Sequence, residues 1–516
     1  MRLIPSSRGG TLWRFTLAAV VVIAFTAATT AVGGLLQFKQ FAADLSLTPP
    51  LKHAQITIAN PGDPQTLLLI GSDHRAGTPW SSANTDTMML ARLDPNSSTI
   101  NLLSVPRDLQ VQIPGVGTAK LNAAYSAGGP NLLVQILQQQ VFPGLRVNHI
   151  IDVNFGGFEA LVDQIGCVYT DVDHRYYNNT AVTDYSSIDI QPGYQKLCDG
   201  NALAFVRYRH GDNDLVRNAR QQDFVRWAKQ GYSLSQLLAN RDTLLKIFGE
   251  HTETDADLHT TDGLINLFNL VAFSDAHAIK QIEFPAILQP CLPPPPGANS
   301  ATQQTPCYVT ADPTAEAQAY TQFMTPATAQ ASKPTSSAAS AGSAAPTPKT
   351  AALVADASDG KAQARALANS GLPVYYPQLI PTGAQYCTPE NASCPMGDGN
   401  TAAADRVPSG YPRAYQIHDQ SGTAHDSYRM TLVISSDAGE YIGVQGTTWQ
   451  SPPILDSPTQ TRTVAGRQLL LYINGGKISV VGWRTPQAVY WISNTLRNDL
   501  SNQQMIGIAA SLTRAS

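Results

Sequence analysis

The sequence has few charged residues and no excess of basic ones. Charged side chains make up 14% of the 516 residues, with 34 Lys and Arg against 38 Asp and Glu, and the formal net charge is −4. A protein that binds nucleic acid in general carries a basic excess along one face or tail, so the composition argues against that class. The hydrophobic content of 43% and the length allow two globular domains with linkers.

The chain also lacks the cysteine spacing of a zinc site. It contains no CxxC pair and no cluster of cysteine with histidine, which are the usual arrangements of structural zinc ligands. The cysteines are even in number and fall into three pairs that are close in sequence, which predicts three disulfides and an oxidising compartment. Proximity in sequence favours the pairs Cys167–Cys198, Cys291–Cys307 and Cys387–Cys394.

No charged residue occurs between Phe15 and Phe38, a run of 24 residues rich in Ala, Val, Ile and Leu. A helix of this length crosses a bilayer core of about 30 Å. Because Arg2, Arg8 and Arg14 precede the run, the positive-inside rule places the N-terminus in the cytoplasm and the rest of the chain outside. The alternative is a cleaved signal peptide, but its apolar region is usually only ~7–15 residues long, so we predict an uncleaved, single-pass membrane anchor.

Composition divides the remainder into two domains joined by a linker. The linker is rich in Pro, Ala, Ser and Thr, which cannot bury a core. We predict a cytoplasmic tail at residues 1–14, a transmembrane anchor at 15–38, a stalk at 39–65, a catalytic domain at 66–290, a linker at 291–351 and an accessory domain at 352–516.

The first domain alternates strand and helix patterns, which predicts a layered α-β-α sandwich. The predicted strands are 66–73, 85–94, 99–108 and 149–155, and the predicted helices are 131–142 and 158–166. The second domain shows strand alternation with glycine turns and ends in an amphipathic helix, so we predict a β-rich α+β domain there. Its aromatic residues could form a sugar-stacking surface, although aromatic residues of β domains usually lie in the core; they are Trp449, Trp483, Trp491, Tyr472 and Tyr490.

Arginine is concentrated between Ala204 and Trp227. The pattern predicts a strand, a short acidic loop and a helix. Arg207 and Arg209 would share one face of the strand, and three more polar residues would share one face of the helix; these are Arg217, Arg220 and Gln221. Arginines that converge in this way can bind a phosphate-rich anion.

Acidic and basic residues also follow the predicted strands. Asp73 and Arg75 lie in GSDHR, Asp86 lies in NTDT, and Arg107 and Asp108 lie in SVPRD. Two aspartates at one sheet edge can bind Mg²⁺ or Mn²⁺ together with a substrate phosphate, and arginines can hold the phosphate by bidentate hydrogen bonds. Each motif alone also fits a turn or a surface ion pair.

The motifs together resemble the LytR-CpsA-Psr family of cell-wall proteins. The resemblance runs from about Thr66 to Trp227 and rests on LLLIGSD, TDTMMLARLD, LLSVPRD, KLNAAYSAGG, FGGFEALVDQIG and LCDGNALAFVRYRHGDNDLVRNARQQDF in this order. It implies an Mg²⁺-dependent ligase. Such an enzyme transfers an anionic glycopolymer from a polyprenyl-pyrophosphate carrier to the muramic acid 6-hydroxyl of peptidoglycan, through a phosphodiester. The alternatives are a lipid-pyrophosphate hydrolase and a non-enzymatic envelope-binding protein.

The resemblance also implies roles for individual residues. Asp73 and Asp86 match the metal-binding aspartates. The residues that match those holding the pyrophosphate and stabilising its charge are Arg107, Arg207, Arg209, Arg217 and Gln221. Other residues of the same motifs have less defined roles; they are Arg75, Arg220, Asp214, Lys120 and Asn122. Either Asp86 or Asp108 could serve as the general base, and the apolar stripe of either predicted helix could line a slot for the lipid tail.

One position departs from the family pattern. Where the family usually has Arg, two residues before the second aspartate, this chain has Asn84. The change removes one cation from the expected pocket and places the usual substrate in question. A Cys167–Cys198 disulfide resembles actinobacterial members, in which arabinogalactan often replaces teichoic acid.

Overall fold

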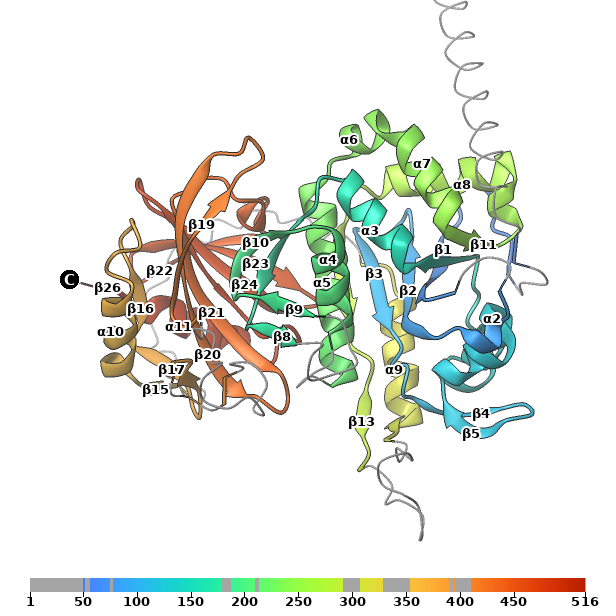
Figure 1. Ribbon diagram of the computed structural model, residues 1–516, viewed down its shortest axis with the longest axis horizontal. Coiled ribbons are helices and arrows are strands. Elements are labelled where there is room, and N and C mark those ends of the chain that lie inside the picture. The colour runs from blue at the N-terminus through green and yellow to red at the C-terminus, as the bar shows by residue number, and fades with distance from the viewer. Residues whose placement is uncertain are drawn as a thin grey trace, which may run out of the picture.

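The two domains lie side by side, and helices α4 (Asp199–Arg207) and α5 (Asp214–Gly231) stand between them (Figure 1). The computed structural model describes residues 50–51, 56–74, 78–178, 187–208, 213–290, 307–327, 353–389, 391, 393–394 and 410–515. The predicted anchor at 15–38 lies outside these residues. Within the described ranges, no helix combines the length and the apolar character needed to span a bilayer.

A mixed six-stranded sheet forms the centre of the first domain. Its strand order is β11-β6-β1-β2-β3-β12. The central strands β1 and β2 are antiparallel, whereas β6 runs parallel to β1 and β12 runs parallel to β3. The strands span Gln65–Ser72 (β1), Thr85–Leu93 (β2), Thr99–Ser104 (β3), His149–Asn154 (β6), Thr252–Thr254 (β11) and Ala278–Ile282 (β12). The four strands predicted from apolar runs are therefore present.

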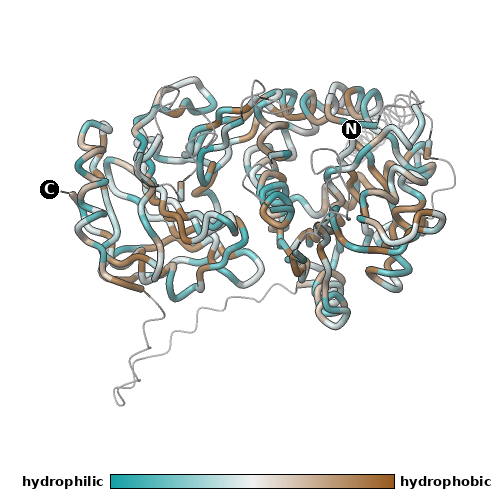
Figure 2. Tube along the Cα trace, turned by 60° about the horizontal axis from the view of Figure 1, so that its bottom comes forward, coloured by the Kyte–Doolittle hydropathy of each residue, from teal (hydrophilic) through white to brown (hydrophobic). Residues whose placement is uncertain are grey.

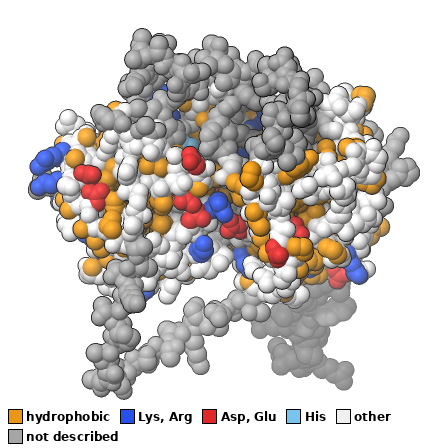
Figure 3. Space-filling view, turned by 90° about the horizontal axis from the view of Figure 1, so that it is seen from below, with side chains coloured by type: hydrophobic (Ala, Val, Ile, Leu, Met, Phe, Trp, Pro, Cys, Tyr) orange, Lys and Arg blue, Asp and Glu red, His pale blue; other side chains and the backbone are white. Residues whose placement is uncertain are grey.

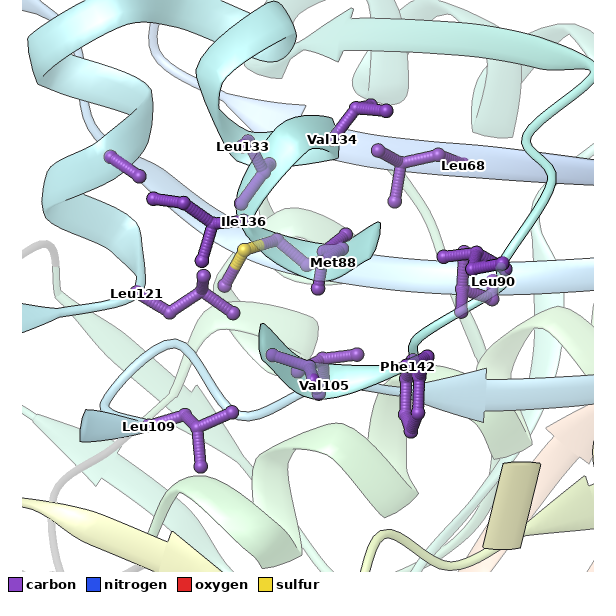
Figure 4. Close-up of a cluster of buried hydrophobic side chains, with 14 of the residues drawn as sticks. Leu68, Met88, Leu90, Val105, Leu109, Leu121, Leu133, Val134, Ile136 and Phe142 are labelled. Carbon is purple, nitrogen blue, oxygen red and sulfur yellow. The ribbon is translucent and has the colours of Figure 1, made fainter. Parts of the chain in front are cut away.

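Helices cover both faces of this sheet. On one face, Leu68, Leu90 and Leu103 are fully buried and pack with Leu133 of α2 (Asn122–Ile136) (Figure 4). On the other face, alternate strand residues pack against α7 (Arg241–His251) and α8 (Thr261–Phe273). Because successive side chains of a strand point to opposite faces, near-continuous apolar runs are what a sheet covered on both sides requires. The first domain is thus a mixed α/β domain with helices on both faces of its sheet.

Part of the predicted linker belongs to the first domain. Residues Pro313–Met324 form α9, whose Asp312 N-cap accepts hydrogen bonds from the backbone of Thr314 and Ala315. The Phe323 side chain is fully buried in the same core as Leu68. The predicted linker at 291–351 therefore contains a helix that packs on the six-stranded sheet of the first domain. Because the segment is rich in Ala and Thr, its sequence did not reveal that a helix capped by Asp312 begins there.

An antiparallel sheet dominates the second domain. Its order is β18-β20-β21-β25-β24-β23-β22, and β19 also pairs with β20. The strands span Gln385–Tyr386 (β18), Arg413–His418 (β19), Ala424–Ser435 (β20), Glu440–Thr447 (β21), Gln460–Val464 (β22), Arg467–Asn474 (β23), Lys477–Arg484 (β24) and Val489–Ser493 (β25). The final helix α11 (Asn502–Ser511) is the helix that the amphipathic pattern predicts. It begins with a capping box between Ser501 and Gln504.

Short ladders and further helices complete the fold. The ladders are β4 (Gln110–Ile113) with β5 (Gly117–Lys120), β7 (Val168–Val172) with β10 (Gly193–Leu197), β8 (Tyr176–Asn178) with β9 (Ile188–Ile190), β13 (Ala286–Leu288) with β14 (Val309–Ala311), β15 (Leu353–Ala355) with β17 (Leu379–Pro381) and β16 (Tyr375–Pro377) with β26 (Leu512–Arg514). The further helices are α3 (Phe155–Gln164), α6 (Leu234–Ala239) and α10 (Ala357–Ala366).

The tryptophans and tyrosines considered for sugar stacking are buried. Trp483 and Trp491 are 2% and 1% exposed, and Tyr490 is fully buried. Figure 2 shows apolar segments running through the interior of both domains. The suggested sugar-stacking surface is therefore wrong, because these rings fill the core of the β-rich domain. On the face seen in Figure 3, acidic and basic side chains lie next to one another, so neither charge dominates that surface.

A buried ion pair joins the two domains. Asp171 of β7 accepts a hydrogen bond of 2.7 Å from Nη1 of Arg429, and both side chains are almost completely buried. Gln445 and Ser493 donate to the same carboxylate. Tyr194 of β10 lies beside this network and packs edge-on against Trp491. The contact between the domains is therefore packed like a core.

Two predicted disulfides are present in the described residues. Cys167 is bonded to Cys198 and Cys387 to Cys394. The first joins the ends of β7 and β10, and Cys198 is the N-cap of α4. Cys291, a member of the third predicted pair, lies outside the described residues.

Arg429→Ala should lower the free energy of unfolding by about 3–5 kcal/mol, because it leaves the buried Asp171 carboxylate without its cation. Thermal and denaturant unfolding of the purified protein measure this loss. Arg462→Ala, at an exposed position of β22, is the matched control and should change stability by less than about 0.5 kcal/mol. Equal effects of the two substitutions would contradict a structural role for the interdomain pair.

Candidate active site

Strands β1 and β2 bring two aspartates to one edge of the sheet. The backbone N–H of Asp73, just after β1, donates to the carbonyl of Asn84 at 3.2 Å. The Asp73 carboxylate in turn accepts a 2.5 Å hydrogen bond from the Asn84 backbone N–H. Asp86 lies at a bulge in the β1–β2 ladder, between Thr85, which pairs with Ser72, and Thr87, which pairs with Gly71. The two predicted metal ligands therefore lie at the same end of this strand pair.

Three arginines converge on the Asp86 carboxylate. Arg107 donates to one of its oxygens through Nη1, and Arg207 Nε lies 3.3 Å from the other. Arg217 Nη1 lies 3.8 Å from the carboxylate, while its Nη2 donates to the Asp86 carbonyl at 2.9 Å. The structure thus brings together three of the four arginines that the sequence assigned to catalysis.

The pKa of Asp86 is lowered. Burial alone raises the pKa of this carboxyl, but the positive charges of Arg217, Arg107 and Arg207 outweigh burial. Asp86 is therefore held as a carboxylate. A carboxylate with a depressed pKa is a weak proton acceptor, which makes Asp86 a poor general base in this arrangement.

Asp214 fixes two of the arginines. It lies in the first turn of α5, whose Asn213 N-cap accepts hydrogen bonds from Leu215 and Val216. Its carboxylate binds the side chain of Arg217, one turn further along the helix, and accepts the Arg107 backbone N–H at 3.0 Å. Since Arg217 is completely buried, Asp214 supplies the charge and the orientation that this guanidinium needs.

Arg207 reaches the site from the end of a helix. The sequence pattern predicted a strand here, but residues Asp199–Arg207 form α4, which starts at the disulfide-bonded Cys198. The strand prediction is wrong because Asp199 lies in the first turn of a helix capped by Cys198, and this helix is held by burial of Ala202, Phe205 and Val206. The guanidinium carbon of Arg207 lies 3.9 Å from the ring centroid of Phe155, a cation–π contact that the sequence analysis did not identify.

Two more residues of the arginine-rich segment 204–227, Arg220 and Gln221, contact the backbone at the end of α4. Arg220 is fully buried and donates to the carbonyls of Phe205 and Tyr208, on either side of Arg207. Gln221 donates to the carbonyl of Val206 at 3.0 Å. In this geometry both side chains hold the end of α4 in place. Arg209 and Arg75 lie outside the described residues, and their assigned roles stay predictions.

Lys120 and Asn122 contact the residues that follow β3. Lys120 Nζ forms an ion pair of 3.0 Å with Asp108. The Asn122 backbone N–H, at the start of α2, donates to the carbonyl of Arg107 at 3.0 Å. These bonds hold Asp108 and the carbonyl of Arg107, so Lys120 and Asn122 act on the orientation of this arginine.

Asp73 and Asp86 are the carboxylates that the family resemblance assigns to a divalent cation, and both Asp86 oxygens already contact arginines. No group of three or more potential His, Cys, Asp or Glu ligands occurs in the described parts of the chain. Mg²⁺ typically uses one or two carboxylates together with substrate phosphates and water. Asp73, which is exposed, and Asp86 could supply those two carboxylates.

A buried polar cluster behind Asp73 escaped the sequence analysis. Ser72 and Tyr125 both donate to the Asp152 carboxyl group, at 2.7 and 2.5 Å. Burial raises the pKa of Asp152 to about 6. The cluster fixes the end of β1 from which Asp73 projects. Its only sequence signal is an aspartate inside the apolar strand His149–Asn154.

The two helices suggested for a lipid slot differ in their surroundings. Leu133, Val134 and Leu137 in the first are completely buried in the main core. In α3, Val162 is buried, whereas Phe158 is only partly buried and packs near Phe224 of α5. The first apolar stripe is therefore ordinary core.

The sequence is similar to known cell-envelope proteins. The model of the LytR_cpsA_psr family matches residues 37–319. The chain is 31% identical over 211 residues to a polyisoprenyl-teichoic acid–peptidoglycan teichoic acid transferase TagU of Oceanobacillus iheyensis, covering 39% of this chain and 62% of that protein. It is 35% identical over 170 residues to a probable cell wall biosynthesis protein LcpB of Corynebacterium glutamicum, covering 30% of this chain and 39% of that protein.

The chain spans about half the length of the curated relatives that it matches, with 62%, 51% and 39% of three of them covered. Among solved structures, it is similar to the Bacillus subtilis TagV crystal structure at 23% identity and a TM-score of 0.40, over 51% of this chain and 97% of that one.

Asp173→Asn should remove a pH-dependent part of the stability. Burial opposes ionisation of Asp173, but His174, Tyr176 and Arg220 lower its pKa to about 2. Because the folded pKa lies below the unfolded value of about 3.9, ionised Asp173 stabilises the fold above about pH 4, by about 2 kcal/mol, and this contribution is lost as the pH falls towards 2.

The variant should therefore be less stable than the wild type at pH 7, and the difference should shrink between pH 4 and pH 2. Denaturant unfolding at several pH values measures it. Asp437→Asn, at an exposed turn position, is the control. A stability difference between Asp173→Asn and wild type that does not vary with pH would show that the Asp173 charge does not stabilise the fold.

Proposed function

The chain belongs to the LytR_cpsA_psr family, and from this premise we propose that it is a membrane-anchored, extracytoplasmic glycopolymer–peptidoglycan transferase. The donor is a glycopolymer on a polyprenyl-pyrophosphate carrier, and the acceptor is a sugar hydroxyl of peptidoglycan. The observation that carries the proposal is the convergence of Arg107, Arg207 and Arg217 on Asp86. The charge-free run at 15–38 and the two disulfides support the location.

The arginine cluster suits a pyrophosphate better than a single phosphate. Three guanidinium groups surround one carboxylate, and each can hold phosphate oxygens through parallel N–H donors. Arg207 is 39% exposed at its side chain, whereas Arg217 is completely buried. The cluster therefore has an open side, where a substrate enters, and a fixed side, where a guanidinium is held in advance of binding.

In the reaction that we propose, the acceptor hydroxyl attacks the phosphorus that carries the polymer. The bond from this phosphorus to the bridging oxygen breaks, polyprenyl phosphate leaves with the electron pair, and the proton of the attacking hydroxyl passes to water. The arginines neutralise charge on the pyrophosphate and on the leaving phosphate, which is the main requirement of phosphoryl transfer. A Mg²⁺ or Mn²⁺ ion at Asp73 and Asp86 would supply further neutralisation when bound.

The second face of the sheet offers an apolar surface for the lipid. Leu69, Ile100 and Val153 project from the strands and are only partly buried. Phe248 of α7 and Leu267 of α8 lie over them and are also partly buried. Apolar surface that the protein leaves partly uncovered can be covered by a hydrocarbon chain. We propose that the polyprenyl tail lies between this face and the two helices.

Two kinds of polymer fit the proposed transfer. Relatives are named for teichoic acid transfer, while the Cys167–Cys198 disulfide resembles actinobacterial members and favours an arabinogalactan-like polymer. Asn84 contributes no charge. Its side-chain amide lies 3.4 Å from the Asp73 carboxylate, so it orients this aspartate where the family usually places an additional cation.

Arg207→Ala should reduce polymer transfer by about 10²–10³-fold, the effect of removing one preorganised donor from a developing charge. The assay incubates the purified full-length protein with Mg²⁺, a polyprenyl-pyrophosphate-linked glycopolymer and peptidoglycan, and measures linked polymer. Arg226→Ala is the control on α5, since Arg226 pairs with Asp223 rather than with Asp86.

The wild-type assay also separates the alternatives. Free polymer phosphate without linked product, under every acceptor condition, would identify a hydrolase. No turnover of the carrier at all would point to a non-enzymatic envelope-binding protein. An Arg207→Ala variant with full transfer activity would contradict the assigned site.

A further inference from the structure

A polar pocket lies between the two domains. Its volume is about 260 Å³. The first domain contributes the outer face of α5 and strand β12, and the second contributes the β23–β24 turn and the segment before α11. One wall of the pocket therefore comes from the second domain, which completes the pocket by docking on the first.

The walls carry two lysines without a partner. Neither Lys280 of β12 nor Lys477 of β24 forms an ion pair or a side-chain hydrogen bond with any described residue. By contrast, Arg497 is already bound to Glu283 across the domain interface. The pocket thus presents two uncompensated ammonium groups, which attract an anion into it.

Amide and apolar side chains line the rest of the pocket; the apolar ones are Leu215, Ala219, Ile282, Phe284 and Leu496. Asn218 of α5 is 7% exposed, and its amide makes no hydrogen bond to the described parts of the chain. The side-chain amides of Asn498 and Gln322 likewise make no hydrogen bond to any described residue. An amide offers a donor and an acceptor together, which matches the paired hydroxyl and acetamido groups of a sugar. The combination of lysines and amides fits an anionic saccharide rather than a hydrocarbon chain.

The pocket and the arginine cluster are built on the same two segments of the chain. Asn218 follows Arg217 directly on α5, and Ser104, also in the wall, precedes Arg107 by three residues. Three residues of extended chain span at most about 11 Å. A saccharide in the pocket would therefore lie within a few sugar units of a pyrophosphate at Asp86.

We propose that this interdomain pocket binds an anionic saccharide unit of the substrate. Lys280 and Lys477 would bind its carboxylate or phosphate group, and the three amides would bind its neutral polar groups. The second domain then has a defined role, because it completes a substrate subsite beside the reacting phosphate. This inference rests on the proposed function, since it names part of the substrate of that site.

Two sources can supply such a saccharide: the acceptor glycan, with the carboxylates of its stem peptides, and the donor polymer, with its phosphates. Isothermal titration of the full-length protein in detergent micelles separates them with two soluble probes. One is a peptidoglycan disaccharide-peptide fragment and the other is a glycerol phosphate oligomer. We expect one of them to bind in the pocket.

The charge-reversed variant Lys280→Glu/Lys477→Glu should weaken binding of that probe by about tenfold or more, because two charge-assisted contacts become repulsive. Lys280→Arg/Lys477→Arg should retain binding. The control Lys361→Glu/Arg462→Glu, an equal double charge reversal at exposed positions of α10 and β22, should leave it unchanged. Thermal unfolding verifies that the variants are folded.

Loss of binding of the peptidoglycan fragment would assign the pocket to the acceptor, and loss of binding of the glycerol phosphate oligomer would assign it to the donor. Binding of neither probe to the wild type, or equal binding to all variants, would overturn the proposal. The titration requires no turnover. A protein that binds the probe in the pocket but transfers no polymer would therefore contradict the proposed function without contradicting the pocket assignment.

Discussion

The site depends on balancing three positive charges in a small, largely enclosed space. Arg107, Arg207 and Arg217 would repel one another if they were gathered without counter-charges. Asp86 contacts all three, and Asp214 binds Arg217 while it fixes the backbone of Arg107. A buried guanidinium is tolerated only when it is paired and hydrogen-bonded. The carboxylates therefore allow the protein to hold an anion site in advance of its substrate.

The second domain extends this support outward. Arg429 binds the Asp171 carboxylate and donates to the carbonyl of Asp173 at 2.9 Å. Asp173 accepts a hydrogen bond from Tyr176, and Arg220 in turn donates to the Tyr176 hydroxyl at 3.2 Å. Arg220 then binds the backbone on either side of Arg207. A continuous set of buried polar contacts thus links the β-rich domain to the backbone on either side of Arg207.

Local signals in the sequence were sufficient for much of the first domain. The apolar runs ending at Ser72 and Ser104 are strands, and Asp73 after the first run and Arg107 after the second reach the same sheet edge. The segment before Arg207 was misread, because alternation over a few residues does not distinguish a strand from the end of a short helix. Contacts between distant residues carried no local signal. Asp171 and Arg429 are 258 residues apart, so neither the docking of the domains nor the pocket between them was predictable.

The central claim is that the arginines around Asp86 form a pyrophosphate site. A crystal structure of the protein with a short polyprenyl pyrophosphate and Mg²⁺ tests it most directly. The account predicts that the pyrophosphate lies among Arg107, Arg207 and Arg217, with its hydrocarbon chain directed towards the sheet face beneath α7 and α8. A pyrophosphate bound elsewhere, with Asp86 still paired to all three arginines, would contradict it.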